Sequence, residues 1–322
     1  AVGASSQPGE RRNAKAMGWS LGALLSAMVA PGPLLGDLFQ DLHLLQWNPH
    51  WQCTAWNVSN CAFEAGKALS QLLRSLDIDF ANIIEYREPG YVLPEPWSSV
   101  PSATCGLDVL DLVYNRALWA AIPSNASNWT GCMQEAPADR PFLIQEFARL
   151  RTSERLVVVA AHFPHPPTIS SQSMEEAVVL KKALREVLGS TATRRVLLIA
   201  DTNEYPSTSN RHIAEYLGFP GGVVVNTSLE PTCCFDTDFA EWGTFDRILA
   251  NFGDVMETRV LFDPLPEWAK EQRGGRRGAF HKAIHGVLRS QDWPLTPGAR
   301  MWSTVLLAIF GGASALAWCC RP

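Results

Sequence analysis

The chain has few charged residues and no excess of positive charge. Only 18% of its 322 residues are charged, and the formal net charge is −5. A protein that holds nucleic acid on a broad basic surface needs a positive balance, so the sequence disfavours that class. A narrow cleft that holds a phosphodiester through a metal ion is compatible with this charge. The hydrophobic content of 47% excludes a disordered chain.

Cysteine pairs of the CxxC type and internal repeats are both missing. A metal site built on cysteines is therefore disfavoured, because such sites use closely paired thiolates. An even number of cysteines in the central region predicts disulfides in an oxidising compartment; they are Cys53, Cys61, Cys105, Cys132, Cys233 and Cys234. Cys53 and Cys61 can close a small loop, but the sequence does not fix the pairing of the six. Four Asn-X-Ser/Thr sequons predict glycosylation at Asn57, Asn125, Asn128 and Asn226.

The first 36 residues have the pattern of a secretory signal. Arg11, Arg12 and Lys15 precede an uncharged apolar run from Met17 to Ala30. A basic flank followed by an apolar stretch of this length is typical of such signals. A buried helix or a short membrane anchor is the alternative. We therefore assign residues 1–36 to a signal-like segment and expect the chain in the secretory pathway or at the cell surface.

Residues 301–320 form a second run without charges. As a helix this run would be about 30 Å long, the thickness of the hydrocarbon core of a membrane. Arg300 and Arg321 flank it, and a tryptophan lies near each of its ends, where interfacial aromatic residues belong. We expect a transmembrane helix after a linker at 291–300, which would attach the protein to a membrane. A lipid-anchor signal that is later removed is the alternative.

The region between these ends, residues 37–290, alternates short apolar runs with amphipathic segments, which predicts an α+β domain. Six runs predict strands, at Leu42–Trp47, Phe80–Glu85, Val109–Tyr114, Leu156–Ala161, Val196–Ala200 and Phe245–Ala250. Glu64–Leu76 has leucines at helical spacing. A second helix is predicted to start at a capping box at Ser173 and to run to Leu188, before Gly189.

Polar side chains follow most of the predicted strands. The run Val196–Ala200 ends in Asp201, and Asn203 lies two residues further on the same face of the chain. The other candidates are Asn48, Glu85, His162, Asp246 and His281. Singly, each has a structural alternative, such as a turn at Asp201 and Asn203. Together at one edge of a sandwich they would form an oxygen-rich site with two imidazoles, which suits Mg²⁺ or Mn²⁺.

Taken in this order, the set resembles the endonuclease/exonuclease/phosphatase superfamily, which has the deoxyribonuclease-like fold. The resemblance covers nearly all of residues 37–290 and implies a four-layer αββα sandwich of two mixed β-sheets flanked by helices. It also implies a role for each residue: Asn48 and Glu85 support the metal ion, His162 contacts the phosphate, Asp201 and Asn203 position the nucleophile and the phosphate, and Asp246 orients His281.

The chain departs from the family pattern at four positions. Ala200 replaces a glycine, and Ala279-Phe280 stands where the family usually has Ser-Asp before its last histidine. Because phenylalanine cannot bind a cation, either one metal ion is held by Glu85, Asn48 and water, or activity is reduced. His50 falls where some members have an aspartate. His285 is the second candidate, after His281, for the position of the family's last histidine.

The chemistry that this set predicts is metal-assisted hydrolysis of a phosphoester. Asp201 would accept a proton from the attacking water or align it, while Asp246 would hold His281 in one tautomer and favour its protonated form. Two substrate classes are open, a lipid headgroup for a sphingomyelinase-like enzyme and a nucleic acid for a nuclease. A catalytically silent surface-binding module on the same fold is the alternative function. No protein partner is predicted.

Overall fold

The computed structural model describes residues 41–56, 60–87, 91–123, 130–135, 138–166, 174–189, 194–221, 224–233, 243–270 and 280–289. The predicted signal at 1–36, the linker at 291–300 and the helix at 301–320 lie outside the described residues. Asn57, Asn125, Asn128 and Ser173 also lie outside them. Within the described ranges, no helix is long and apolar enough to cross a membrane.

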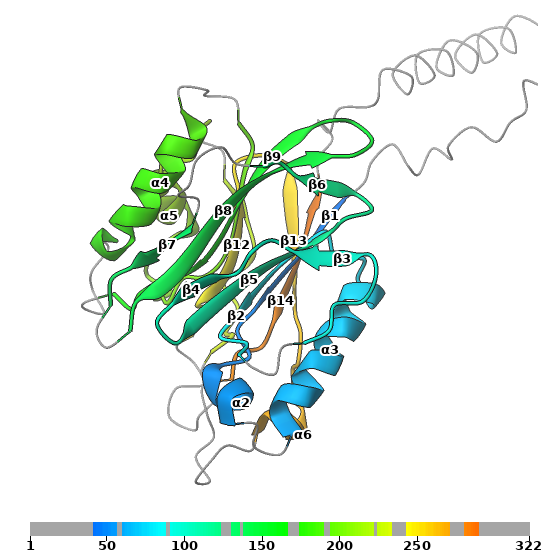
Figure 1. Cartoon of the computed structure of the whole chain (residues 1–322). Coiled ribbons are helices and arrows are strands. Elements are labelled where there is room, and N and C mark those ends of the chain that lie inside the picture. The colour runs from blue at the N-terminus through cyan, green and yellow to red at the C-terminus, as the bar shows by residue number, and fades with distance from the viewer. Residues whose placement is uncertain are drawn as a thin grey trace, which may run out of the picture. The chain divides into compact units, whose positions relative to one another are not determined.

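Two mixed β-sheets form the centre of the described structure (Figure 1). The first has the order β13 (Val255–Val260), β14 (Ile284–Arg289), β1 (Leu42–Trp47), β2 (Phe80–Ile84), β5 (Asp108–Asn115) and β3 (Trp97–Ser99), with β4 (Ala103–Cys105) also paired to β5. The second has the order β11 (Val225–Asn226), β12 (Asp246–Ala250), β10 (Val196–Asp201), β9 (Arg155–His162), β8 (Arg140–Arg149) and β6 (Trp119–Ala121), with β7 (Thr130–Met133) also paired to β8.

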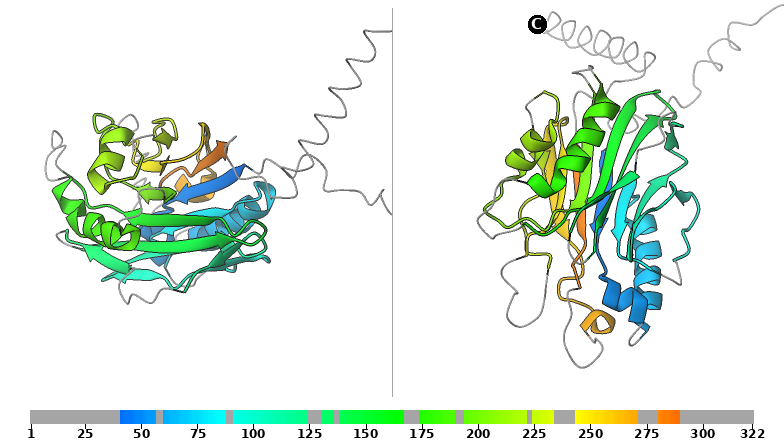
Figure 2. Two further views of the ribbon diagram at one scale, coloured as in Figure 1. Left: turned by 90° about the horizontal axis from the view of Figure 1, so that it is seen from above. Right: turned by 60° about the vertical axis from the view of Figure 1, so that its left-hand side comes forward.

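Helices cover the outer faces of the two sheets, as the two views of Figure 2 show. The first sheet carries α2 (Trp51–Trp56), α3 (Cys61–Ser75) and α6 (Glu267–Lys270). The second carries the short 3₁₀ turn η3 (Glu175–Ala177), α4 (Val178–Leu188) and α5 (Asn210–Leu217). The inner faces of both sheets share a third apolar cluster. Two mixed sheets with helices on them confirm the predicted α+β sandwich.

The surroundings of strand β9 explain why its sequence is a continuous apolar run rather than an alternation of apolar and polar residues. Val157 and Val159 pack under the helices of the second sheet, whereas Leu156 and Val158 pack between the sheets. Both faces of the strand are therefore buried, which removes the usual polar alternation. The same holds for β10, all six residues of which are buried.

All six predicted strands are confirmed, with ends that differ by one residue at most. Helix α3 begins at Cys61, three residues before the predicted start, and Gly189 ends α4 with a positive φ of 58°, as expected. Strand β8 was not predicted, although it is the longest strand described. Residues Ile284–Arg289, which include His285, form strand β14.

The register of the strands brings the ends of both sheets to one edge of the sandwich. In the second sheet Asp201 lies opposite His162 on parallel β9 and opposite Asp246 on antiparallel β12. In the first sheet the amide N–H of His281 donates to the carbonyl of Asn48 (3.2 Å). The N–H of Glu85 donates to the carbonyl of Val109 on β5 (2.8 Å).

Two disulfides lie close to this edge. Cys53–Cys61 joins α2 to α3, and Cys105–Cys132 joins β4 of the first sheet to β7 of the second. The loop that the sequence allowed between Cys53 and Cys61 is therefore formed. Cys233 is also disulfide-bonded.

Candidate active site

Two aspartate–histidine pairs face a third aspartate at the shared edge of the sheets. Nδ1 of His162 lies 2.7 Å from Oδ2 of Asp108, and Nδ1 of His281 lies 2.7 Å from Oδ2 of Asp246. Both histidines also approach Oδ2 of Asp201, at 3.6 Å. All five side chains are buried. The arrangement places one carboxylate between two imidazoles, each of which has its own carboxylate partner.

Asp201 is held in place from several directions. Its Oδ2 accepts a hydrogen bond from the side-chain amide of Asn48 (3.0 Å), and its Oδ1 accepts one from the backbone N–H of Asn203 (3.1 Å). Burial opposes its ionisation, but His281 and His162 outweigh burial and lower the pKa of Asp201 below its usual value. An acid this strong is a poor proton acceptor at neutral pH. It is better suited to align a nucleophile than to deprotonate it.

Protonated imidazoles are favoured at both histidine positions. Burial lowers the pKa of His281, but Asp246 and Asp201 outweigh it and raise that pKa to about 9. In the same way, Asp108 and Asp201 outweigh burial and raise the pKa of His162. The acids of the site thus favour the protonated form of both imidazoles, and a protonated imidazole is a cationic donor to a phosphate.

Asn48 and Glu85, the predicted metal ligands, lie against one turn of the backbone. Two consecutive N–H groups bind them, that of His50 to Oδ1 of Asn48 (2.8 Å) and that of Trp51 to Oε2 of Glu85 (3.1 Å). The two side-chain oxygens therefore lie close together. Each has a second lone pair that can bind a cation. This pair of hard oxygen ligands fits a divalent ion such as Mg²⁺.

His50 does not replace the aspartate that some family members have at its position. Burial lowers its pKa to about 3, and the charges of His281, His162 and Arg140 add to this effect. The imidazole is therefore neutral and cannot supply the negative charge of a carboxylate. The backbone at His50, Glu85 and Asn203 is left-handed, with φ of 69°, 57° and 49°. Such values are uncommon outside glycine and cluster at functional sites.

The remaining predicted residues divide into one that joins the site and two that do not. Asn203 joins it, with its side-chain amide donating to the carbonyl of Phe163 (2.7 Å). Phe280 is fully buried in the core, where its ring packs against Trp268 (5.5 Å between ring centroids). His285 lies on β14 with Nε2 3.3 Å from Nδ1 of His43, outside the contacts of the site. His285 is thus not the imidazole that pairs with Asp246.

Four further residues belong to the site but were not predicted. Asp108 and Arg140 begin β5 and β8, and Gln46 and Asn82 lie inside β1 and β2. The amide of Asn82 donates to Oε1 of Gln46 (2.8 Å), and the amide of Gln46 donates to Oδ1 of Asp246 (2.9 Å). The amide of Asn82 also donates to the carbonyl of Ile199 in the other sheet (2.9 Å). Polar residues within otherwise apolar strands were the available signal for this network.

Removing the carboxylate of Asp108 is expected to lower the pKa of His162 and to destabilise the fold. In Asp108→Asn the imidazole loses its closest negative charge while it stays buried, so its protonated form is disfavoured. Breaking a buried ion pair of this kind costs about 3 kcal/mol of unfolding free energy. Histidine NMR titration and urea unfolding measure the two effects. Asp111→Asn, on the same strand, is the control, and a pKa of His162 unchanged from the wild type would contradict the assignment.

Glu204 directly follows Asn203 in the chain, and its carboxyl group lies near that of Glu176. It is fully buried, Oε2 accepts from Thr208 (2.7 Å), and burial followed by Glu176 raises its pKa from 4.5 to about 7. Because the folded-state pKa is above the unfolded one, ionisation costs stability as pH rises from about 4.5 to 7. A pKa shift of this size corresponds to roughly 3 kcal/mol of unfolding free energy.

Glu204→Gln is therefore expected to be more stable than the wild type at pH 8 and equally stable at pH 4. Glutamine keeps an acceptor for Thr208 and has no charge to bury. Thermal unfolding measured across this pH range tests the prediction. Glu215→Gln, on the exposed face of α5, should leave the difference between the two pH values unchanged. Parallel stability curves for Glu204→Gln and the wild type would refute the prediction.

The sequence matches no family model and no curated protein. Solved structures match its fold. An endonuclease/exonuclease/phosphatase family protein from Bacteroides thetaiotaomicron has a TM-score of 0.57 at 12% identity, covering 79% of this chain and 99% of that chain. A second protein so described, from Bacteroides vulgatus, has a TM-score of 0.54 at 15% identity and covers 78% and 100%. A mannosyl-6-phosphatase from Bacteroides thetaiotaomicron has 0.54 at 12% identity and covers 76% and 98%.

Proposed function

We propose that this chain, which has the endonuclease/exonuclease/phosphatase fold, is a divalent-metal-dependent phosphoester hydrolase. The observation that carries the proposal is the Asp201 carboxylate between two imidazoles, each paired to an aspartate at 2.7 Å. A binding surface does not require two buried cationic imidazoles around one carboxylate. Hydrolysis of a phosphoester benefits from such cations, because negative charge builds on the phosphate oxygens as the bond to the leaving group breaks.

Each residue has a specific task in this proposal. Asp201 aligns the attacking water, since its low pKa makes it a weak base. His281, with Nδ1 held by Asp246, directs Nε2 toward a phosphate oxygen. His162, with Nδ1 held by Asp108 and Nε2 3.6 Å from Oδ2 of Asp201, adds a second positive charge beside that carboxylate. A bound divalent ion on Asn48 and Glu85 would add Lewis-acid stabilisation of the phosphate charge. Removal of Mg²⁺ or Mn²⁺ is then expected to abolish activity.

The substrate class within this proposal is a phosphodiester. Either a lipid headgroup, as for a sphingomyelinase-like enzyme, or a nucleic acid would present the same diester to the site. The predicted membrane helix at 301–320 favours the lipid headgroup, and the net charge of −5 disfavours a nucleic acid held on a broad surface. A phosphomonoester is the third class, and one protein of similar fold is named a mannosyl-6-phosphatase.

A location in the secretory pathway or at the cell surface completes the proposal. Two disulfides between described residues support it, since such bonds persist in oxidising compartments. The predicted signal at 1–36, the membrane attachment through 301–320 and the glycosylation of the four sequons are parts of the same proposal. Among the sequons, Asn226 lies on the short edge strand β11 and is partly exposed.

A substrate panel tests the function. Purified full-length protein is incubated with a chromogenic phosphodiester, its monoester, plasmid DNA and sphingomyelin vesicles, each with Mg²⁺, with Mn²⁺ and with EDTA. We expect diester hydrolysis that EDTA abolishes. Release of a soluble headgroup from the vesicles identifies a lipid substrate, and nicking of the plasmid identifies a nuclease.

The alternative is a catalytically silent surface-binding module on the same fold. Phe280, in place of the usual aspartate, is the observation that favours it. Absence of hydrolysis of every phosphoester in the panel, with both metal ions present, would replace the proposed enzyme by this alternative.

A further inference from the structure

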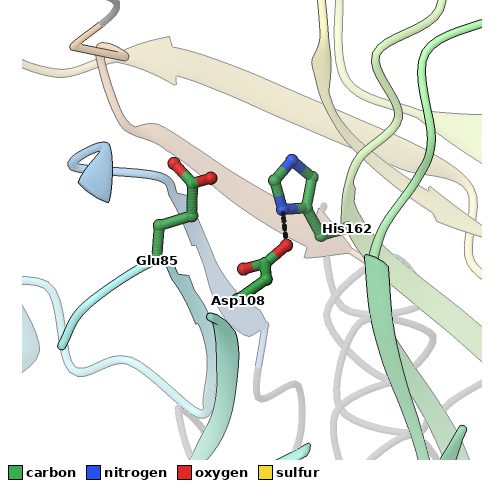
Figure 3. A group of neighbouring side chains, drawn as sticks. All are labelled: Glu85, Asp108 and His162. Atoms are coloured by element: carbon green, nitrogen blue, oxygen red, sulfur yellow. Dashed lines mark ion pairs between the residues drawn. The ribbon is translucent and has the colours of Figure 1, made fainter. Parts of the chain in front are cut away.

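Three side chains of the site form a cluster that suits a metal ion. Glu85, Asp108 and His162 are buried, and each offers a ligand atom within 4.8 Å of those of the other two. Figure 3 shows these side chains turned toward one another, with the ion pair between Asp108 and His162 dashed. Three groups so arranged are a candidate metal site.

The guanidinium of Arg140 already lies against all three groups. Its Nη1 is 3.2 Å from Oε1 of Glu85, 3.3 Å from Oδ2 of Asp108 and 3.5 Å from Nδ1 of His162. The side chain is only 16% exposed. Arg140 thus fills the place that a cation bound to this cluster would take.

Arg140 is also fixed from behind, so it does not swing freely out of the cluster. Its Nε donates to Oε2 of Glu135. The other oxygen of Glu135 lies 2.7 Å from Nδ1 of His165 and accepts the backbone N–H of the same residue (3.3 Å). An arginine side chain stays protonated at every physiological pH, so the positive charge in the cluster is permanent.

We propose that Arg140 is a built-in cation that closes the Glu85–Asp108–His162 cluster to metal, so that the protein binds one divalent ion rather than two. The inference rests on the proposed function for the location of that single ion, at Asn48 and Oε2 of Glu85, whereas Oε1 of Glu85 is the oxygen that contacts Arg140. A second ion in the cluster would lie in contact with the guanidinium, and like charges repel strongly at that distance in a buried site. Arg140 also gives Asp108 and Glu85 a counter-charge when no metal is bound.

The number of ions bound tests this inference without an activity assay. Mn²⁺ binding to the folded full-length protein is measured by calorimetry and by electron paramagnetic resonance. We expect one Mn²⁺ per chain in the wild type and in Arg140→Lys, which keeps a positive charge. Arg140→Met removes the charge with little change in length, and we expect it to bind two Mn²⁺. Arg155→Met, which removes an exposed arginine on β9, is the control and should bind one.

Three results would overturn the inference: two Mn²⁺ per wild-type chain, two in Arg140→Lys, or one in a folded Arg140→Met protein. If Arg140→Met does not fold, the wild-type count and the Arg140→Lys count decide alone, and two ions in either refutes the closed cluster. A failure of the proposed function has a different signature. In that case the change from one ion to two persists, but no phosphoester is hydrolysed by the wild type.

Discussion

His281→Ala is expected to lower the rate of phosphodiester hydrolysis by about 10³-fold with little change in KM. The imidazole is held by Asp246 at 2.7 Å, and its pKa of about 9 keeps it protonated at neutral pH. Its charge is most valuable when negative charge builds on the phosphate, so the loss falls on kcat. Steady-state kinetics with a soluble diester, at saturating Mg²⁺, measure both constants.

His285→Ala is the matched control for this variant. It removes an imidazole four residues along the chain that contacts His43 instead of the acids of the site. We expect kcat within about twofold of the wild type. A similar loss in both variants would mean that the fold, rather than the chemistry, depends on these histidines. A retained kcat in His281→Ala would remove the residue from the mechanism.

Glu85→Gln is expected to produce the second large effect, a loss of metal binding together with a fall in kcat of about 10²–10³-fold. The substitution keeps the shape of the side chain and one acceptor for the N–H of Trp51. It removes the negative charge that attracts the ion. Titration of activity with Mg²⁺ should show a much higher half-saturating concentration, and calorimetry with Mn²⁺ should show weaker binding.

Glu257→Gln controls for the loss of one negative charge, because this residue lies on β13 and pairs only with Arg289 among the ion pairs described. Its Mg²⁺ dependence should match that of the wild type. If Glu85→Gln binds Mn²⁺ as tightly as the wild type does, the ion is held elsewhere. The second acidic cluster, Asp201 with Asp246 and His281, would then be the next candidate.

The sequence allowed residues of the site to be predicted where a polar side chain stands at the end of an apolar strand. Asp201 follows a run that is buried on both faces, and parallel pairing with β9 puts His162 directly beside it. The carboxyl ends of parallel strands meet at one edge, so the convergence of these groups could be predicted. The same logic places Asn48 and Glu85 at one edge, since they follow β1 and β2, which are parallel.

Asp108 and Arg140 were missed because they stand at the start of antiparallel strands rather than at the end of parallel ones. An antiparallel strand presents its first residue where its neighbour ends, so β5 and β8 deliver these side chains to the same edge. Strand β8 is rich in large apolar and charged residues without clean alternation, and its pairing depends on distant contacts. Only the tertiary register identifies its first residue as part of the site.

The family pattern at position 280 did not predict the role of Phe280 in the structure. The sequence predicted a missing metal ligand, whereas the structure gives the ring a role of its own in the core. It contacts Trp47 and Phe262, at 6.0 and 6.3 Å between ring centroids. Three aromatic partners need matching positions far apart in the chain, and a single sequence cannot reveal such a match.

The covalent link between β4 and β7 constrains how the protein can be produced. Each of these strands pairs with the strand that carries Asp108 or Arg140, so the Cys105–Cys132 bond fixes the opening between the sheets on that side. Closing a loop of 27 residues stabilises a fold by about 3–4 kcal/mol. Expression in a reducing bacterial cytosol would forgo this tether. Preparations intended for metal counting or kinetics therefore call for export to the periplasm or for a eukaryotic secretion host.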